Sequence, residues 1–453
     1  GSSRVSMVMT TLPTLDTMVS APAVWLTTLG CAKNQVDSDK LEARLDAAGY
    51  VRASSLEVAD VVMVNTCAFI EAARRESVDM VLDHADRKRT DARLIVLGCM
   101  AQRYQSELGD LLPEADAVLG MEKYGELIGD LDRLTGWQPI RLATSPMDIL
   151  YEVRRPTPAT PYAYVKVAEG CDKSCTFCVI PQFRGAQRSR SPVNIREEIA
   201  SLCEAGVGEI VLVAQDLAAF GRDIDAPGGI VDLLRFVSDV DGLRRLRLLY
   251  LYPREVSDAL IEEMAKNPVI VPYFDLSLQH AAGSLLRAMR RPGDGERHLD
   301  LIGRIRSATS ESAMRSSFIV GFPGETEDDV DTLERFLEAA QLDWAGFFAY
   351  SAEEGTPAAL LPGQVEPDVV AERIRRLQGV QDRVTAERNA AVIGQEFDVV
   401  VDLVEDGTPI GRSYREAPEI DGVILLDRGR SGEWLRARIT ASYGSELAGE
   451  VVG

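Results

Sequence analysis

The sequence predicts an α/β protein with three parts: an N-terminal domain built on a parallel sheet, a central partial barrel of six β/α units, and a small C-terminal antiparallel β-barrel of the oligonucleotide-binding type. Two observations predict it. Short apolar runs alternate twice along the chain with helical patterns, which is typical of parallel sheets covered by helices. After Gly394 the pattern changes to short alternating strands separated by glycine-containing turns, as in small β-barrels.

The two alternating series form the first two domains. In the first, strands are expected at Val24–Leu29, Val61–Asn65, Arg93–Leu97 and Ala117–Leu119, with helices near Ser38–Ala48, Ala72–His84 and Arg103–Leu111. In the second, six strands are expected at Tyr162–Val167, Glu209–Ala214, Leu246–Tyr250, Tyr273–Leu278, Arg315–Val320 and Trp344–Tyr350. Since eight units close a β/α barrel, six predict a barrel that stays open at one side.

A long polar helix and the C-terminal strands complete the expected elements. The helix covers Pro367–Val392 and is rich in arginine and glutamate, which favours a place between domains. Strands follow at Phe397–Val404, Gly422–Leu426 and Trp434–Thr440. The changes in pattern predict these limits: a tag remnant without order at 1–22, the N-terminal domain at 23–137, a proline-rich linker at 138–160, the partial barrel at 161–388 and the C-terminal barrel at 389–453.

Composition and charge restrict the class of protein. The 453 residues are 46% hydrophobic and 26% charged, as in soluble globular proteins. No apolar run approaches the roughly 18 residues that span a bilayer, and no secretory signal is visible, so we expect a cytoplasmic protein without membrane contact. The 71 acidic and 49 basic residues give a net charge of −22. Because such a chain repels nucleic-acid phosphates unless it hides a basic patch, the charge favours a basic protein substrate.

Three cysteines stand at equivalent places in the N-terminal domain. Cys31, Cys67 and Cys99 each follow the carboxyl end of a predicted strand by one or two residues. Open α/β sheets bind ligands outside the carboxyl ends of their strands, so we expect the three thiols to meet at one site. The alternative is three unrelated cysteines of the core.

A second set of three cysteines lies on one loop after the first barrel strand. Cys171, Cys175 and Cys178 form a C-x3-C-x2-C run. Three thiolates suit a cubane iron–sulfur cluster, in which each cysteine ligates one iron and one iron stays open. A structural zinc site would need a fourth ligand nearby, and the sequence offers none. Cys203, inside a predicted helix, is expected to be a core thiol and no ligand.

The cysteine run and a second motif resemble the radical S-adenosylmethionine (SAM) enzymes. In that family the open iron binds SAM, and the aromatic residue before the last cysteine, here Phe177, shields the cluster. The stretch 318–326 resembles the fifth-strand motif of the family, whose backbone packs on the adenine, although it also predicts a plain strand, turn and helix N-cap. The resemblance implies six residues that contact the cofactor: Phe177, Gln215, Gln279, Ile319, Gly321 and Glu325.

The order of the three domains narrows the resemblance to the methylthiotransferases, over nearly all of residues 24–453, with a TRAM domain as the C-terminal barrel. Strings such as Leu29–Ser38 and Tyr350–Thr356 resemble the branch that modifies ribosomal protein S-twelve. Relatives that modify tRNA tend to carry Arg-Pro-Gly where this chain has Glu353-Glu354-Gly355. Ser277 departs from the usual proline of the family, and this removes only backbone stiffness.

The resemblance implies a complete reaction. A cluster on the loop cysteines would reduce SAM to methionine and a 5′-deoxyadenosyl radical, which would take a hydrogen from the β-carbon of an aspartate. A cluster on the N-terminal cysteines would hold sulfur and deliver a methylthio group, its methyl coming from a second SAM. No catalytic residue beyond the cluster ligands is implied. The implied cofactors and partners are two [4Fe–4S] clusters, SAM, ribosomal protein S-twelve or the small ribosomal subunit, and an electron donor, and the chain is expected to be a monomer.

Two other functions stay open on the sequence alone. One is a methylthiotransferase that acts on tRNA adenosine, and the other is a non-catalytic iron–sulfur or zinc protein that holds metal without cleaving SAM. Residues 391–453 hold six basic and twelve acidic side chains, a net charge of −6, which favours a basic ribosomal protein over tRNA. We expect Glu419 and Asp421 to be among the exposed carboxylates that attract that substrate.

Overall fold

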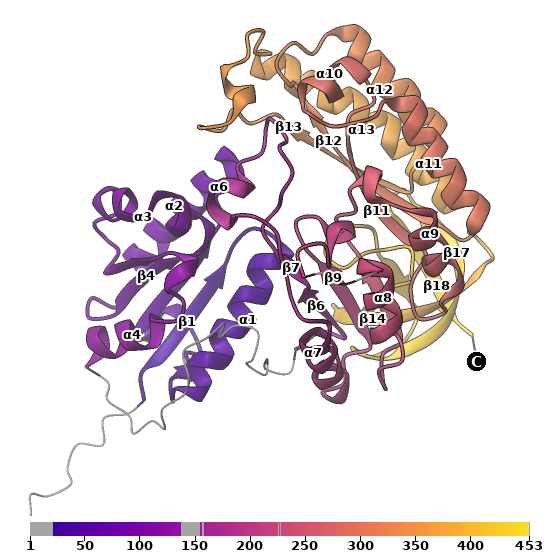
Figure 1. Cartoon of the computed structure of the whole chain (residues 1–453). Helices are drawn as coiled ribbons and strands as arrows, with labels where there is room; N and C mark the ends of the chain where they lie inside the picture. Colours follow the sequence, from indigo (N-terminus) through magenta and orange to yellow (C-terminus); the bar gives the residue numbers. More distant parts are fainter. Residues whose placement is uncertain (1–20, 137–154, 156–157, 225, 227, 453) are drawn as a thin grey trace, which may run out of the picture.

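The computed structural model describes residues 21–136, 155, 158–224, 226 and 228–452 (Figure 1). The expected tag remnant at 1–22 therefore lies outside the described residues up to position 20, and the expected linker at 138–160 lies mostly outside them. Three parts follow one another along the described chain: the sheet domain, a larger β/α domain and a small barrel near the C-terminus. No helix in the described ranges is long and apolar enough to cross a membrane.

The N-terminal domain is a parallel sheet of five strands in the order β2-β1-β3-β4-β5. Apolar side chains of β3 and β4 point alternately into the two faces of the sheet, and the helices cover both faces (Figure 1). The strands are β1 (Ala23–Thr28), β2 (Val51–Arg52), β3 (Val61–Thr66), β4 (Arg93–Leu97) and β5 (Ala117–Leu119). The helices are α1 (Ala32–Ala47), α2 (Glu71–Arg87), α3 (Gly98–Leu111) and α4 (Leu127–Thr135).

The central domain is an open barrel of six parallel strands, as the sequence predicts. Strands β10-β9-β6 and β11-β12-β13 form two three-stranded sheets, and parallel bridges from Leu246 to Ile270 and from Leu251 to Leu276 join them between β10 and β11. The barrel strands are β6 (Tyr162–Lys166), β9 (Glu209–Val213), β10 (Arg245–Leu248), β11 (Tyr273–Gln279), β12 (Ala313–Val320) and β13 (Trp344–Ala349). A short hairpin pairs β7 (Ala168–Glu169) with β8 (Arg188–Ser189).

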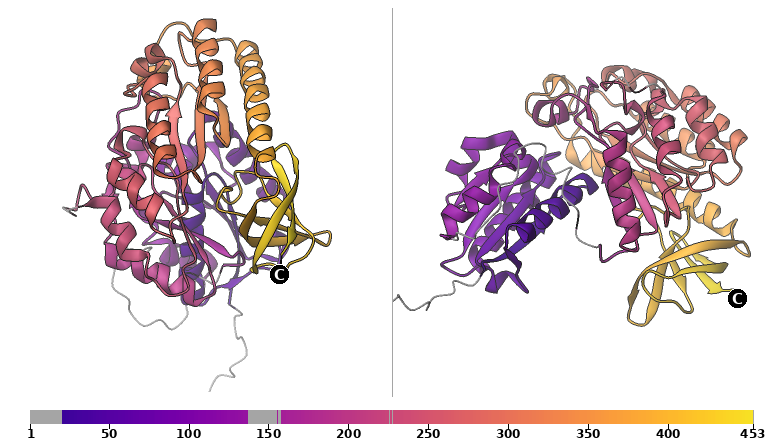
Figure 2. Two further views of the ribbon diagram at one scale, coloured as in Figure 1. Left: turned by 90° about the vertical axis from the view of Figure 1, so that its right-hand side faces the viewer. Right: turned by 60° about the horizontal axis from the view of Figure 1, so that its bottom comes forward.

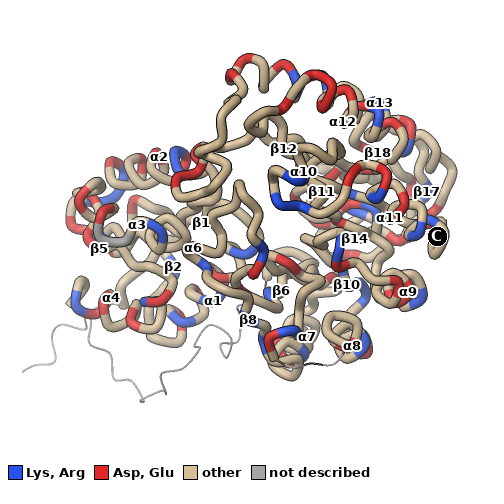
Figure 3. The backbone as a smooth tube through the Cα atoms, turned by 45° about the horizontal axis from the view of Figure 1, so that its top comes forward, with Lys and Arg blue, Asp and Glu red and all other residues tan. Residues whose placement is uncertain are grey.

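Helices cover the outside of this barrel and share one apolar core with its strands. They are α6 (Ile180–Arg184), α7 (Pro192–Glu204), α8 (Gly229–Val237), α9 (Asp258–Lys266), α10 (Gly283–Ala288), α11 (Gly295–Ala308), α12 (Glu327–Ala340) and α13 (Pro367–Ala390). The polar helix α13 contacts β13 of the open barrel and β17 of the C-terminal barrel, so it joins the two domains. It also contacts α12, and ion pairs such as Arg376 to Asp331 at 2.6 Å join the two helices, which carry many charged residues (Figure 3).

The C-terminal domain is a closed barrel in the order β14-β15-β16-β18-β17. Its strands are β14 (Glu396–Glu405), β15 (Thr408–Arg412), β16 (Ile424–Leu426), β17 (Trp434–Tyr443) and β18 (Glu446–Val451). Four of its pairings are antiparallel, and the pairing of β16 with β18 is parallel. The predicted fold class is confirmed, with this one parallel pairing as an added detail of the barrel.

The C-terminal barrel lies against the open barrel (Figure 2), and buried ion pairs join the two. The carboxylate of Glu209, on β9, lies 2.8 Å from Nε of Arg247 and 3.1 Å from Nη1 of Arg412, which belongs to β15. Burial opposes ionisation of Glu209, but the charges of Arg412, Arg247 and Arg245 outweigh it and lower its pKa to about 2. The two barrels therefore share a desolvated charge network instead of a loose, wet contact.

The expectation that both Glu419 and Asp421 are exposed is wrong for Asp421 and is confirmed for Glu419. The Asp421 carboxylate is buried and accepts hydrogen bonds from the Tyr273 hydroxyl at 2.5 Å and from Nε of Arg315 at 3.1 Å. Glu419 accepts a hydrogen bond from the Tyr162 hydroxyl at 2.8 Å. Both carboxylates therefore serve the contact between the barrels, a role that a count of charges along the sequence does not reveal.

Candidate active site

Cys31, Cys67 and Cys99 lie at one edge of the N-terminal sheet. They follow β1, β3 and β4, which are neighbours in the sheet, and the strand order reverses between β1 and β3. Such a switch point is where open α/β sheets bind ligands. Cys31 is the N-cap of α1, and Cys99 lies in the first turn of α3. The N–H groups and positive dipole ends of two helices thus lie beside thiols that must ionise to bind metal.

Two glycines allow this close approach. Gly30 and Gly98, each directly before a cysteine, have φ angles of +95° and +89°, a region that side chains disfavour. A Cβ atom on Gly30 would lie 2.9 Å from Sγ of Cys67, and one on Gly98 would lie 2.2 Å from Oδ1 of Asn65. Glycine is therefore required before both cysteines, because of the positive φ angles and because no room is left for a side chain.

The three N-terminal thiols share one electrostatic environment. Burial opposes ionisation of Cys31, but the charges of Lys33 and Arg184 outweigh it and lower the pKa of the thiol. Burial, with contributions from the neighbouring Cys99 and Cys31, raises the pKa of Cys67 to about 12. The three cysteines therefore interact with one another as charges, as ligands of one group would.

The loop cysteines form a second such set, between β7 and α6. Burial raises the pKa of Cys178 to about 12, and the neighbouring Cys175 and Cys171 contribute to the rise. The Arg291 guanidinium lies 3.7 Å from Sγ of Cys175 and stacks at 3.8 Å on the Tyr252 ring. Arg291 was missed by the sequence analysis, because nothing local marks an arginine after α10 as a neighbour of this loop.

The donor sets fit clusters better than single metal ions. Within the described part of the chain, no three His, Cys, Asp or Glu side chains are close enough to share one metal ion. Thiolates on one zinc, each about 2.3 Å from it, would be crowded together. In a cubane each cysteine ligates its own iron, so three thiols that interact electrostatically without meeting at a point suit it. Cys203 lies apart, buried in α7 among residues of the open-barrel core.

Two of the residues expected to contact SAM lie against one apolar cluster. Phe177 and Ile319 both pack against buried side chains that include Leu286, Met289 and Phe322. Phe177 is on the cysteine loop and Ile319 is on β12, so the cluster brings the two predicted motifs together. An apolar wall beside the loop cysteines would keep water from that region.

The other four expected SAM residues lie at or after the carboxyl ends of barrel strands. Gln279 ends β11 with φ +70°, an uncommon value for a residue with a side chain. The N–H of Gly321, after β12, donates to Oε2 of Glu325 at 2.9 Å, and Nη1 of Arg373 lies 3.0 Å from the same carboxylate. The carboxylate of Glu325 therefore braces the loop after β12, and its contact with SAM remains a prediction.

Gln215 begins a chain of contacts that ends at the N-terminal cysteines. Its Nε2 donates to Oε1 of Glu169 at 3.0 Å, and the same oxygen accepts from Nη1 of Arg184 at 2.6 Å. Nη2 of Arg184 then donates to Sγ of Cys99 at 3.0 Å and to Oδ1 of Asn34 at 2.9 Å. The buried Arg184 thus links the N-terminal cysteines to a strand end of the open barrel. The sequence analysis missed it, because its partners lie 15 to 150 residues away.

A second buried contact joins the same two domains. Glu353, in the loop after β13, pairs with Arg74 of α2 and lies 2.9 Å from Nη1 of Arg103 of α3. The Glu353 side chain is 2% exposed, so this contact excludes water. The string around Glu353 that resembles one branch of methylthiotransferases therefore sits where the N-terminal domain meets the barrel.

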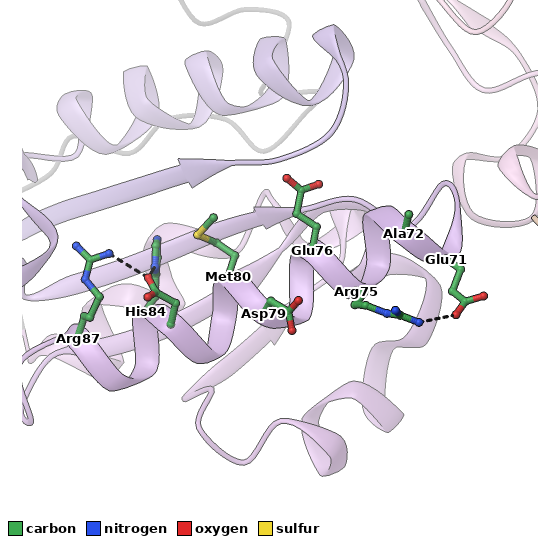
Figure 4. Close-up of a pocket in the computed structure, with 9 residues that line it drawn as sticks. Glu71, Ala72, Arg75, Glu76, Asp79, Met80, His84 and Arg87 are labelled. Atoms are coloured by element: carbon green, nitrogen blue, oxygen red, sulfur yellow. Dashed lines mark hydrogen bonds and ion pairs between the residues drawn. The ribbon is translucent and has the colours of Figure 1, made fainter. Parts of the chain in front are cut away.

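The hollow along the outer face of α2 is not part of this site (Figure 4). It has a volume of about 850 Å³, and its lining includes Glu71, Arg75, Asp83 and Arg87. These charges pair with one another, at 3.1 Å between Glu71 and Arg75 and at 3.0 Å between Asp83 and Arg87. The lining residues include none of the six cysteines, so we place no chemistry there.

Comparison with known proteins assigns a family to each domain. Residues 23–120 match the uncharacterized protein family UPF0004, residues 165–337 match the radical SAM superfamily, and residues 393–452 match the TRAM domain. The chain is 39% identical to the ribosomal protein uS12 methylthiotransferase RimO of Saccharopolyspora erythraea, with 96% of each chain covered. It is 43% identical to the RimO of Moorella thermoacetica, over 92% of this chain and 96% of that one.

The chain belongs to the RimO family of methylthiotransferases. A RimO of Geobacter sulfurreducens is 40% identical, over 95% of this chain and 98% of that one. This RimO-family chain is therefore a radical SAM transferase, and its cofactors are [4Fe–4S] clusters and SAM. The resemblance inferred from the cysteine run, the fifth-strand motif and the domain order is confirmed.

The fold alone is shared with a more distant solved structure. The radical SAM methyltransferase TsrM of Kitasatospora setae, with cobalamin and a [4Fe–4S] cluster bound, matches with a TM-score of 0.55 and 16% sequence identity, over 75% of this chain and 74% of that one. At this identity the match supports the arrangement of sheet domain and barrel in the RimO-family chain and nothing about its substrate.

Proposed function

We propose that this enzyme adds a methylthio group to the β-carbon of an aspartate in ribosomal protein uS12, in the cytoplasm. The observation that carries the proposal is the near full-length similarity to proteins named for that substrate, at 39% to 43% identity. The proposal covers the whole length of those relatives, because the chain spans 96% of each. We further propose that the substrate is uS12 either free or bound in the ribosome, that an electron donor reduces the clusters, and that the enzyme is a monomer.

The two thiol sets are the proposed cluster ligands. Cys171, Cys175 and Cys178 would hold the cluster that binds SAM, and Cys31, Cys67 and Cys99 would hold the second one. When bound, these groups supply the one-electron chemistry, the sulfur and the methyl group. The domain limits proposed from the sequence, 23–137 and 161–388, assign one set to each of the first two domains.

The protein's own residues shield the proposed cluster sites from water and hold the two domains in place. Phe177 and Ile319 form part of an apolar wall beside the loop cysteines, which keeps a reactive centre dry. Arg184 and Glu169 hold the edge of the N-terminal sheet against the strand ends of the barrel. The buried pair of Glu353 with Arg103 fixes the same contact at a second point. Two such ties set the separation between the proposed cluster sites.

Charge supports a protein substrate over tRNA. The net charge of −22 opposes phosphate binding, and two arginines of the C-terminal barrel are buried in ion pairs within the protein. Arg412 binds Glu209 and Asp402, and Arg415 binds Asp343 at 3.0 Å. A basic ribosomal protein would instead meet an acidic partner.

The test is anaerobic reconstitution of the enzyme with SAM and a reductant, followed by incubation with uS12 or with tRNA and mass spectrometry of both. A methylthio adduct on one aspartate of uS12 is expected, with none on tRNA. The Cys67→Ala variant is the control, since it should cleave SAM without forming the adduct. An adduct on tRNA adenosine would transfer the proposal to the other branch.

A further inference from the structure

Lys33 is a buried lysine without a carboxylate partner among the described residues. It is 8% exposed and lies in the first turn of α1, two residues after Cys31. Its ammonium lies over the face of the Tyr250 ring, with Nζ 3.5 Å from the ring centroid. A buried charge without a counter-ion is costly, so its presence needs a physical reason.

The other two buried lysines nearby show the contrast. Nζ of Lys40 lies 2.9 Å from the carboxylate of Glu198, and Nζ of Lys166 lies 2.5 Å from Asp37 and 2.6 Å from Glu169. Each has a carboxylate supplied by the protein. Lys33 lacks one, which marks it as the position where an anion from outside would complete the charge balance.

Tyr250 is held rigidly under this ammonium. It follows β10 in the left-handed region, with φ +64°, although it carries a bulky side chain. Its N–H donates to Oδ2 of Asp275 at 2.9 Å, and its carbonyl accepts from the N–H of Leu217 at 3.2 Å. Strain of this kind persists only where surrounding contacts impose it, and it clusters at ligand sites.

The Lys33–Tyr250 contact lies between the two proposed cluster sites. On one side Lys33 is close to Cys31, and the Cys31 thiol is near enough to interact electrostatically with the Tyr250 phenol. On the other side Tyr250 is at a strand end, bonded to the segments that carry Gln215 and Gln279. In the proposed reaction, the β-carbon of the target aspartate must be reached both by the radical formed from SAM and by the sulfur of the second cluster. A position between the two cluster sites meets this requirement.

We infer that the Lys33 ammonium, seated on the Tyr250 ring, binds the side-chain carboxylate of the target aspartate. The inference rests on the proposed function and adds a residue that selects the substrate. An ammonium–carboxylate contact would hold the aspartate so that its β-carbon, one bond from the carboxylate, lies between the two cluster sites. The ring would fix the ammonium by a cation–π contact while leaving its N–H donors for the carboxylate.

The test compares binding of two forms of uS12, with aspartate or asparagine at the target position, to anaerobically loaded enzyme without reductant. The parent is expected to prefer the aspartate form by about tenfold, as a charge-assisted hydrogen bond would provide. Lys33→Met should lose this preference, and Lys33→Arg should keep most of it. Lys266→Met, at an exposed lysine of α9, is the matched control and should bind like the parent.

The readouts separate this inference from the proposed function. SAM cleavage without substrate should stay at the parent level in Lys33→Met, since it depends on the loop cysteines and does not need the target carboxylate. If the parent methylthiolates uS12 but Lys33→Met still prefers the aspartate form, Lys33 does not bind it. Equal loss of preference in Lys33→Arg and Lys33→Met would also overturn the inference, because it would assign the effect to packing. Failure of the parent to modify uS12 would overturn the function itself.

Discussion

Nη2 of Arg184 lies 3.0 Å from Sγ of Cys99, although the two residues belong to different domains. Arg184 ends the helix that begins just after the loop cysteines, and Cys99 begins a helix of the N-terminal sheet. One guanidinium therefore touches a proposed ligand of one cluster and, through Glu169 and Gln215, reaches the strand end beside the other. Buried hydrogen bonds therefore hold the N-terminal cysteines against the open barrel.

Arg184→Met should destabilise the enzyme strongly. The change leaves the buried Glu169 carboxylate with less compensation, and breaking a buried pair costs about 3–5 kcal/mol. Thermal unfolding should show a fall in Tm of several degrees or more. Arg188→Met, at an exposed arginine of the same segment, is the control and should change Tm little. Equal Tm values for Arg184→Met and the parent would refute the bridging role.

The two thiol sets should load iron independently. Reconstituted parent should hold about eight irons and eight sulfides per chain, since each set supports one cubane. Cys171→Ala should lose about half of the iron and all SAM cleavage, whereas Cys67→Ala should lose about half and keep cleavage.

Cys203→Ala is the matched control for these variants. This cysteine is buried in α7 among apolar neighbours, so its loss should cost only about 1 kcal/mol of packing and leave iron and turnover intact. Iron loss in this variant, or loss of cleavage with unchanged iron in Cys67→Ala, would show that the ligands are wrongly assigned.

Glu209→Gln should show how the C-terminal barrel is held. Because arginines lower the pKa of Glu209 to about 2, its carboxylate stabilises the fold at neutral pH, and that contribution is lost as pH falls from its ordinary value of 4.5. The free energy of unfolding of the cluster-free parent should exceed that of Glu209→Gln by about 3 kcal/mol at pH 7. The difference should shrink by about 2 kcal/mol by pH 3. Urea unfolding at several pH values measures it.

Glu450→Gln, at an exposed glutamate of β18, is the control for loss of one negative charge. It should stay within about 0.5 kcal/mol of the parent, as exposed substitutions do. A difference between parent and Glu209→Gln that does not change with pH would contradict the assigned ionisation.

Charge reversal at exposed acidic residues should slow association with uS12. Glu405 and Glu446 are exposed at two hairpins of the C-terminal barrel, so Glu405→Lys with Glu446→Lys changes surface charge without disturbing the contact between barrels. The association rate should fall, and the effect should weaken with salt, because the Debye length is about 10 Å at 0.1 M. Stopped-flow measurements at two salt concentrations test it. An unchanged rate at low salt would place the docking surface elsewhere.

Asp421→Asn should behave differently from that surface pair. Its carboxylate is buried against Arg315 and Tyr273, so the change should lower stability and leave the salt dependence of association as in the parent. Comparison of the two variants distinguishes electrostatic attraction of the substrate from stabilisation of the contact between the barrels.

Local patterns predicted most elements of the fold. The β3 and β4 strands, buried on both faces, appear as mostly apolar runs. The helix N-cap predicted at the end of the stretch 318–326 is present, where Thr326 and Asp329 cap the start of α12. Strands β15 and β18 were missed. Pro409 and Gly411 interrupt the first, and glycine and glutamate dominate the second, so barrel closure and not propensity makes them strands.

The positions of the cysteines were predictable because strand ends in a parallel sheet share one edge. The starts of α1 and α3 were placed several residues late, since the Gly-Cys turn hides the N-caps. Contacts between domains carry no local signal. Arg184, Arg291 and Glu353 look like ordinary charged residues in the sequence. Asp421 was wrongly predicted to be exposed, because a count of charges does not show which of them are buried.

The central claim is that two clusters in one chain place a methylthio group on an aspartate of uS12. The most direct measurement is mass spectrometry of uS12 and tRNA after incubation with the reduced, reconstituted enzyme and SAM. The account predicts one methylthio adduct, located by fragmentation to an aspartate of uS12, with tRNA unmodified. A methylthio group on tRNA adenosine and none on uS12 would contradict it.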